Sequence, residues 1–225
     1  MVVGSNPTWR ANKYLQMNEL NKYFDKIYCV NLDRRPDKWQ ESQEEFEKWG
    51  IKNVERFPAH DGKNLDSKPF KIKSSELGLI LSNVDIIRNC IENGIERLLI
   101  LEDDCYFTED VTTLGNLLPQ IPSDWDFFYF GGNHNAHKGV KAPERISDSV
   151  VRVHHTFSTH AVAINGRFLE TMLSKIEQKT APLDVMFTEL QKIHNVYCFS
   201  PSIAFQRAGY SDIQLREMDY HRWIK

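Results

Sequence analysis

The chain has 225 residues, of which 41% are apolar and 26% are charged, with a formal net charge of -3. These values are typical of a folded globular domain and exclude wholesale disorder. The interspersed charges and the slightly acidic balance argue against a nucleic-acid partner. No apolar run approaches the ~20 residues that span a bilayer, and the first 20 residues lack the apolar stretch of a secretory signal. We therefore expect a cytoplasmic or membrane-peripheral protein without a transmembrane segment.

Short β-rich runs alternate with helical patterns from residue 26 onward, which predicts an α/β domain with a mostly parallel sheet. We expect a single domain at 25–225, preceded by an extension at 1–24 that is either a tag or a short helix. The expected strands lie at 26–32, 53–58, 96–104, 126–132, 150–153, 160–164 and 196–199. The expected helices span 36–49, 74–94 and 111–118, and two more follow Asn165 and begin at Pro182. Residues 133–149 have the composition of a surface loop.

Two sets of residues are expected to serve the core rather than chemistry. The four cysteines, at positions 29, 90, 105 and 198, form no CxxC pair and are predicted to be reduced, buried thiols. The aromatic residues around the 126–132 run alternate as in a strand, so we expect them to be core rather than a base-stacking platform.

Three consecutive acids, Glu102, Asp103 and Asp104, end the run LLIL. Ligands of open α/β sheets bind beyond the carboxyl ends of strands, and a divalent cation would relieve the mutual repulsion of these acids. Hard oxygen ligands favour Mg²⁺ or Mn²⁺, which would also bridge to substrate phosphates. Since side chains alternate along extended backbone, we expect Glu102 and Asp104 on one side and Asp103 on the other, where it would hold a neighbouring loop. The alternative is a solvated acidic turn.

Other polar residues follow the first two expected strands. Arg34 and Arg35 have the planar guanidinium that grips phosphate, although both also suit a solvated turn. Asn31 is a candidate for binding a ligand or for ending its strand. Asp61 is expected to contact a ligand or to cap a turn, and Gly62 to supply a permissive backbone.

Two glycines, Gly131 and Gly132, end the aromatic strand. They would let a ligand approach the backbone closely. A plain tight turn explains them equally well.

Six blocks, in order between residues 26 and 213, resemble glycosyltransferase family 25, which includes bacterial lipooligosaccharide galactosyltransferases and collagen hydroxylysine galactosyltransferases. They are YCVNLDRRPDKW, ERFPAHDGKNL, SSELGLILSNVDIIRNCIENG, LLILEDDCYF, DFFYFGG and PSIAFQRAGYSDI. The resemblance implies a GT-A-type fold, a Mn²⁺ or Mg²⁺ cofactor and a UDP-hexose donor. It implies transfer of galactose or glucose to a hydroxyl of a glycan or a hydroxylysine-type protein acceptor.

The resemblance also assigns roles to residues. The metal would be held by Glu102 and Asp104, with Asp212 as the third ligand or, in its place, one of His154, His155 and His160. The nucleotide-sugar would contact Asn31, Leu32, Arg34, Arg35, Asp61, Gly62, Ser82, Glu102, Asp103 and Gly131.

Inversion at the anomeric carbon would need a base on the acceptor side, and we predict Asp184 for it. Asp184 also suits the start of a helix, where a carboxylate is favoured without any catalytic role. One departure from the family is that its Ser-His pair is Ser82-Asn83 here, and asparagine cannot titrate. This keeps open a catalytically weak carbohydrate-binding relic. Another metal-dependent nucleotide-processing enzyme is disfavoured, because the chain has neither a GxxxxGK[ST] loop nor a second acid cluster.

Overall fold

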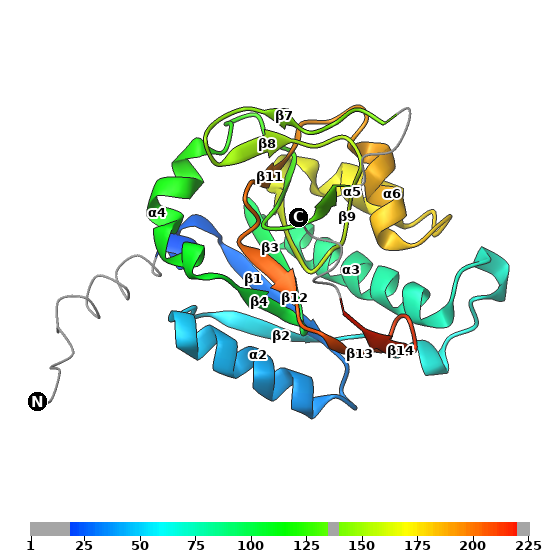
Figure 1. The fold of residues 1–225 in the computed structure, drawn as a ribbon. Helices are drawn as coiled ribbons and strands as arrows, with labels where there is room; N and C mark the ends of the chain where they lie inside the picture. Colours follow the sequence, from blue (N-terminus) through cyan, green and yellow to red (C-terminus); the bar gives the residue numbers. More distant parts are fainter. Residues whose placement is uncertain (1–18, 135–139, 220–225) are drawn as a thin grey trace, which may run out of the picture.

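The computed structural model describes residues 19–134 and 140–219 (Figure 1). Its centre is an eight-stranded sheet with the order β2-β1-β3-β10-β5-β11-β8-β7. Strands β2, β1, β3, β5, β11 and β7 run in one direction, while β10 and β8 run the opposite way. The sheet is therefore mixed, and the expected α/β sheet flanked by helices is confirmed. The strands of this sheet are β1 (Lys26–Asn31), β2 (Val54–Pro58), β3 (Arg97–Glu102), β5 (Phe127–Tyr129), β7 (Glu144–Arg145), β8 (Val150–Arg152), β10 (Ala161–Asn165) and β11 (Val196–Phe199).

Both faces of the sheet are covered, which is why its central strands read as continuous apolar runs. On β3, Leu99 and Leu101 face one cluster of core residues, and Leu98 and Ile100 face the other. Helix α2 (Pro36–Trp49) packs on the first face, and α3 (Ser74–Glu92), α5 (Leu169–Ile176) and α6 (Leu183–Leu190) pack on the second (Figure 1). The aromatic residues 125 and 127–130 and the four cysteines are all buried, as expected, and the cysteines are unpaired.

The helix ends follow from local sequence. Pro36 opens α2, where its missing N–H costs nothing, and Gly50 closes it with a φ of 67°. Helix α3 begins at Ser74, and the Glu76 side chain accepts a hydrogen bond from the Lys73 N–H. The residue at the N-cap position is therefore Lys73, directly before the first serine of the helix.

The segment expected as an extension contributes to the core. Residues 19–23 are helical, and both Leu20 and Phe24 are buried, with the Phe24 ring 6.0 Å from that of Phe130. The rest of the expected extension, residues 1–18, lies outside the described residues.

The second half of the fold contains several short strand pairs, some reaching back to residues 105–107, that the sequence patterns did not indicate. Strand β4 (Cys105–Phe107) pairs with β12 (Ala204–Gln206), and β13 (Gly209–Ser211) pairs with β14 (Arg216–Met218). Within the expected loop at 133–149, β6 (Asn133–His134) pairs with β9 (Thr156–Phe157) and β7 joins the edge of the large sheet. The expected helix at 111–118 is only a short α4 (Leu114–Leu117) between 3₁₀ turns.

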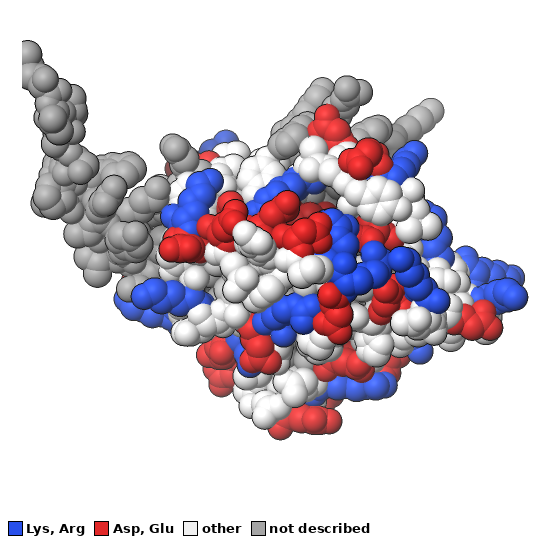
Figure 2. All heavy atoms as spheres, turned by 90° about the horizontal axis from the view of Figure 1, so that it is seen from below, with Lys and Arg blue, Asp and Glu red and all other residues white. Residues whose placement is uncertain are grey.

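Acidic and basic side chains are interspersed on the face of the molecule shown in Figure 2. Among the described residues, no helix combines the length and apolarity that crossing a membrane requires.

Candidate functional site

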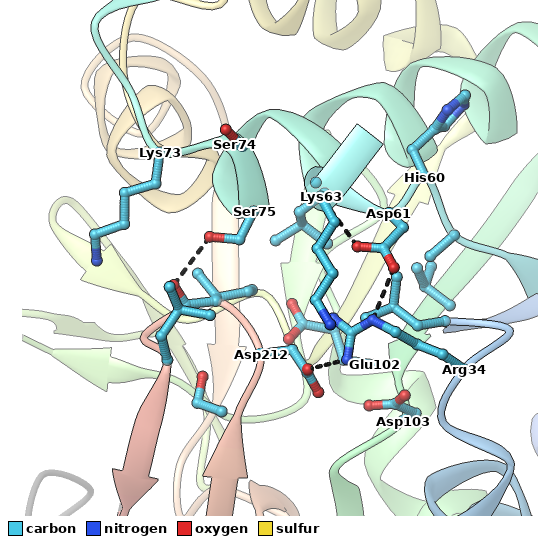
Figure 3. A pocket seen from close by; sticks show the side chains of 18 of the residues that line it. Arg34, His60, Asp61, Lys63, Lys73, Ser74, Ser75, Glu102, Asp103 and Asp212 are labelled. Carbon is cyan, nitrogen blue, oxygen red and sulfur yellow. Dashed lines mark hydrogen bonds and ion pairs between the residues drawn. The ribbon is translucent and has the colours of Figure 1, made fainter. Parts of the chain in front are cut away.

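A cavity of about 350 Å³ lies where β1, β2 and β3 end. The carboxyl ends of these three parallel strands meet at one edge of the sheet, which brings together the residues after each of them. The segment 211–215, which joins β13 to β14, also lines the cavity. Of the residues predicted to bind nucleotide-sugar or metal, the cavity is lined by Leu32, Arg34, Asp61, Gly62, Glu102, Asp103, Asp104 and Asp212 (Figure 3).

The three consecutive acids all border this cavity. Only Glu102 belongs to β3, and the next two residues form a turn, so the alternation expected of extended backbone does not apply to Asp103 and Asp104. Asp103 nevertheless holds a neighbouring segment, since its carboxylate accepts a 2.7 Å hydrogen bond from Asn31 Nδ2 and lies 3.6 Å from Lys38 Nζ.

Burial changes the ionisation of this cluster. It raises the pKa of Glu102 to about 8, with the charge of Asp104 adding to the effect. Burial also raises the pKa of Asp103 and of Asp104, although Lys38 opposes the shift at both. The ionised form of each of the three acids is therefore less favourable in this buried site than in water.

The residues present fit a divalent cation. Glu102 Oε1 accepts a hydrogen bond from Thr159 Oγ1 at 2.5 Å and Asp104 Oδ2 accepts one from Gln206 at 3.4 Å, but within the described residues neither acid forms an ion pair. Asp104 Oδ1 is buried and has no hydrogen-bond partner among the residues that the structure describes. Mg²⁺ and Mn²⁺ are hard cations, and Mg²⁺ is commonly held by one or two carboxylates, with phosphate oxygens and water completing its shell.

The third predicted metal ligand, Asp212, is engaged elsewhere. Its carboxylate accepts a 2.6 Å hydrogen bond from Arg34 Nη1 and another from Arg35 Nη1. Across residues 19–134 and 140–219, no group of three or more His, Cys, Asp or Glu side chains is placed to hold a metal ion. The predicted set of Glu102, Asp104 and Asp212 is thus not assembled, because two guanidinium groups hold the third member.

The three histidines considered as substitutes for Asp212 do not line the cavity. His160 is fully buried beside the end of β3, with Nε2 3.0 Å from the carbonyl oxygen of Ala204. His154 lies 3.8 Å from Glu144, and the His155 ring packs edge-on against Phe157.

The loop after β2 is fixed against helix α3 by two glycines and a serine. A Cβ on Gly62 would lie 2.5 Å from the backbone of Ser74, and one on Gly78 would lie 2.4 Å from the carbonyl oxygen of His60. Ser82 Oγ accepts a 2.9 Å hydrogen bond from the His60 N–H. Ser82 is fully buried and does not line the cavity, so the prediction that it contacts the ligand is replaced by a supporting role.

Replacing Gly78 with Ala should destabilise the fold by about 1–3 kcal/mol, because the added methyl group must push the His60 carbonyl away. In a helix without that contact, the same change would stabilise by roughly 0.5–1 kcal/mol. Gly115 of α4 is the matched control, since its nearest neighbour to a new Cβ is 3.7 Å away. Urea unfolding of both variants measures the difference. Equal stability of the two would contradict the close packing of the loop.

Asn31 and Gly131, which were predicted to contact the nucleotide-sugar, contact other parts of the chain instead. Asn31 is 1% exposed; its Nδ2 donates to Asp103 and to the carbonyl oxygen of Arg35, and its Oδ1 accepts from Arg56. A Cβ on Gly131 would lie 2.0 Å from the carbonyl oxygen of Ala204, so the close approach predicted there is made by the chain itself. Neither residue lines the main cavity.

The predicted base, Asp184, lies in the first turn of α6 outside the cavity lining. Its Oδ1 accepts a 2.8 Å hydrogen bond from the Val185 N–H, and the Ser158 backbone also donates to its side chain. Burial raises the pKa of Asp184, and its charge contributes to the raised pKa of Glu102. Since Thr159 binds Glu102, the adjacent residues Ser158 and Thr159 link the two acids.

Several residues of the site carried no signal in the sequence. Lys38 lies in the first turn of α2, Thr159 precedes β10, and Gln206 ends β12. Each reaches the acids only through the pairing of distant segments. Lys63 directly follows the predicted Asp61 and Gly62, so proximity in the sequence could have indicated it.

These observations define an α/β protein with a cavity at the carboxyl ends of its central strands that is bordered by three consecutive acids. Residues 24–186 match the family model described as glycosyltransferase family 25 (LPS biosynthesis protein). This segment is well over half of the chain, and the chain belongs to glycosyltransferase family 25.

Relatives of the chain are considerably longer. A Glycosyltransferase 25 family member of Drosophila melanogaster is 26% identical over 184 residues, which cover 71% of this chain and 29% of that protein. Procollagen galactosyltransferase 1 of Danio rerio is 28% identical over 227 residues, covering 87% of this chain and 36% of that protein. Among solved structures, a glycosyltransferase involved in the glycosylation of the major capsid of PBCV-1 matches with a TM-score of 0.38 and 11% identity, covering 66% of this chain and 65% of that one. The chain thus spans about a third of the length of the curated relatives named here.

Proposed function

We propose that this chain binds a UDP-hexose together with Mn²⁺ or Mg²⁺ in the cavity and transfers galactose or glucose to a hydroxyl group. One observation carries the proposal: Glu102 and Asp104 border the cavity without an ion pair among the described residues, and one oxygen of Asp104 is buried without a partner. Membership of a glycosyltransferase family makes a sugar donor the fitting ligand. The cavity volume also lies in the range typical of small-molecule sites, roughly 300–1,000 Å³.

Glu102 and Asp104 are the proposed metal ligands. When bound, the cation would neutralise the diphosphate and make it a better leaving group. The protein's own contribution is to fix these acids before the ligand arrives, through Thr159 for Glu102 and Gln206 for Asp104. Such preorganised charge is commonly the largest single contribution to catalysis.

Asp184 remains the proposed base for an inverting transfer. It is connected to Glu102 through the adjacent residues Ser158 and Thr159, which places it close to the proposed metal ligands. Two backbone donors orient its carboxylate. The names of the relatives suggest a protein acceptor of the procollagen type, and the description of the family suggests a glycan acceptor of the lipopolysaccharide type.

The alternative of a relic without turnover rested on Asn83. This side chain is 4% exposed, donates to the Leu79 carbonyl oxygen within α3 and does not line the cavity. The departure from the family pattern thus lies outside the proposed donor site, which favours the active transferase.

A panel of nucleotide-sugars incubated with Mn²⁺ and scored by release of free nucleotide tests the proposal. We expect release of UDP from UDP-galactose or UDP-glucose and its loss when Mn²⁺ is chelated. In the same assay, Asp184→Asn should lower the turnover number and leave the affinity for UDP unchanged, because Asp184 lies outside the donor cavity. Metal-dependent UDP binding without turnover by the unaltered chain would instead indicate the relic.

A further inference from the structure

Most charged groups of the cavity are already neutralised by one another. Of the lysine and arginine side chains that line it, Arg34 pairs with Asp61 and Asp212, Lys38 with Asp103, and Lys73 with Glu76. Lys63 differs from these three. Within the part of the chain that the structure describes, its ammonium group forms no ion pair, and its side chain is exposed and points into the cavity (Figure 3).

The backbone that carries Lys63 is held in place. Asp61 Oδ1 accepts a 3.0 Å hydrogen bond from the Lys63 N–H, and Asp61 Oδ2 is bound by Arg34 Nε at 2.7 Å. Gly62 lies against the start of α3, where any side chain would collide. The lysine thus extends from a fixed base, and only its flexible side chain has to adjust to a ligand.

The unmatched charges of the cavity have opposite signs. Within the described residues, Glu102 and Asp104 form no ion pair with a lysine or arginine, and the Lys63 ammonium group forms none with a carboxylate, although Lys38 and Arg207 act on Asp104 and Lys63 acts on Asp61 from farther away. A ligand that matches both must present positive charge to the acids and negative charge to Lys63. A nucleoside diphosphate that carries a divalent cation has this distribution of charge.

The two arginines predicted to grip phosphate are poorly placed to do so. Both donate to Asp212, whose side chain is only 12% exposed, and Arg35 also pairs with Asp37. A phosphate could reach them only by displacing a carboxylate that two guanidinium groups hold. Their contacts tie the segment 211–215 to the start of α2.

We propose that Lys63, rather than Arg34 or Arg35, binds the diphosphate of the donor. This inference rests on the proposed function, because it takes a nucleoside diphosphate as the ligand. Lysine acts here as a point charge on a flexible stem, a common way for proteins to bind phosphate.

Calorimetric titration with UDP in the presence of Mn²⁺ tests the proposal. Lys63→Gln should weaken UDP binding roughly 10- to 100-fold, the range expected for losing a hydrogen-bonded charge. Lys63→Arg should stay within about threefold of the unaltered chain because it keeps the charge. Uridine, which lacks phosphate, should bind all variants equally. Lys68→Gln is the matched control, since Lys68 is an exposed lysine of the same loop outside the cavity lining.

The outcomes separate the two proposals. If the unaltered chain binds UDP and Lys63→Gln binds it equally well, the role of Lys63 is overturned while the proposed function stands. An equal loss in Lys63→Gln and Lys68→Gln would also overturn it, since the effect would then be one of general charge. No UDP binding by the unaltered chain would overturn the proposed function itself. Thermal unfolding of each variant should match that of the unaltered chain, because the Lys63 side chain makes no ion pair among the described residues.

Discussion

Asp104→Asn is expected to lower metal-dependent sugar transfer by at least about 100-fold while leaving the chain folded. The substitution keeps the size of the side chain but removes the charge that the cation requires. The loss should appear in the turnover number and in the affinity for Mn²⁺, measured by activity at graded metal concentrations and by calorimetry.

The same variant should be more stable than the unaltered chain when no metal is present. Burial raises the pKa of Asp104, so at neutral pH the ionised carboxylate is less favourable in the folded chain than in the unfolded one. An amide removes this cost. Urea unfolding in chelator should therefore show a higher free energy of unfolding for Asp104→Asn.

Asp148→Asn is the matched control for both effects, since the Asp148 side chain is 97% exposed. It should change neither stability nor turnover measurably. Normal transfer rates in Asp104→Asn, or a lower stability in chelator, would contradict the assignment of Asp104.

Asn31→Asp is expected to destabilise the fold by about 2–4 kcal/mol. Asn31 Nδ2 now donates to the carboxylate of Asp103 at 2.7 Å and to the carbonyl oxygen of Arg35 at 3.0 Å. In the variant an ionised oxygen would face both acceptors, in a place that is 1% exposed. The retained contact with Arg56 offsets only part of this cost.

Asn64→Asp provides the comparison, because Asn64 is exposed at the end of the loop that follows β2. Its change in unfolding free energy should stay within about 0.5 kcal/mol. If chemical denaturation showed Asn31→Asp to be as stable as Asn64→Asp, the role of Asn31 in holding Asp103 would be wrong.

The elements that the sequence predicted well are those whose pattern is local. Helix α2 runs from Pro36 to Trp49 and stops at Gly50, as the proline and glycine indicated. Strand β11 has the expected bounds because its four apolar residues are buried. The pairs β4–β12 and β13–β14 were missed, since three-residue strands have too short a pattern to read, and the pairing of β4 with β12 also joins distant segments.

The residues of the site show the same difference between local patterns, which could be predicted, and long-range contacts, which could not. Residues directly after β1, β2 and β3 could be placed together because parallel strands end at one edge of a sheet. The partners of those residues could not be predicted. Arg34 and Arg35 suit a phosphate in isolation, and only the fold shows that Asp212, more than 170 residues away, holds both. Asn31 likewise proved to be saturated by internal hydrogen bonds.

A crystal structure with Mn²⁺ and UDP would test the central claim most directly. Anomalous diffraction should place the manganese ion against the carboxylates of Glu102 and Asp104, with the diphosphate between that ion and the Lys63 side chain. A manganese peak away from these two acids, or a diphosphate bound outside the cavity, would contradict the account.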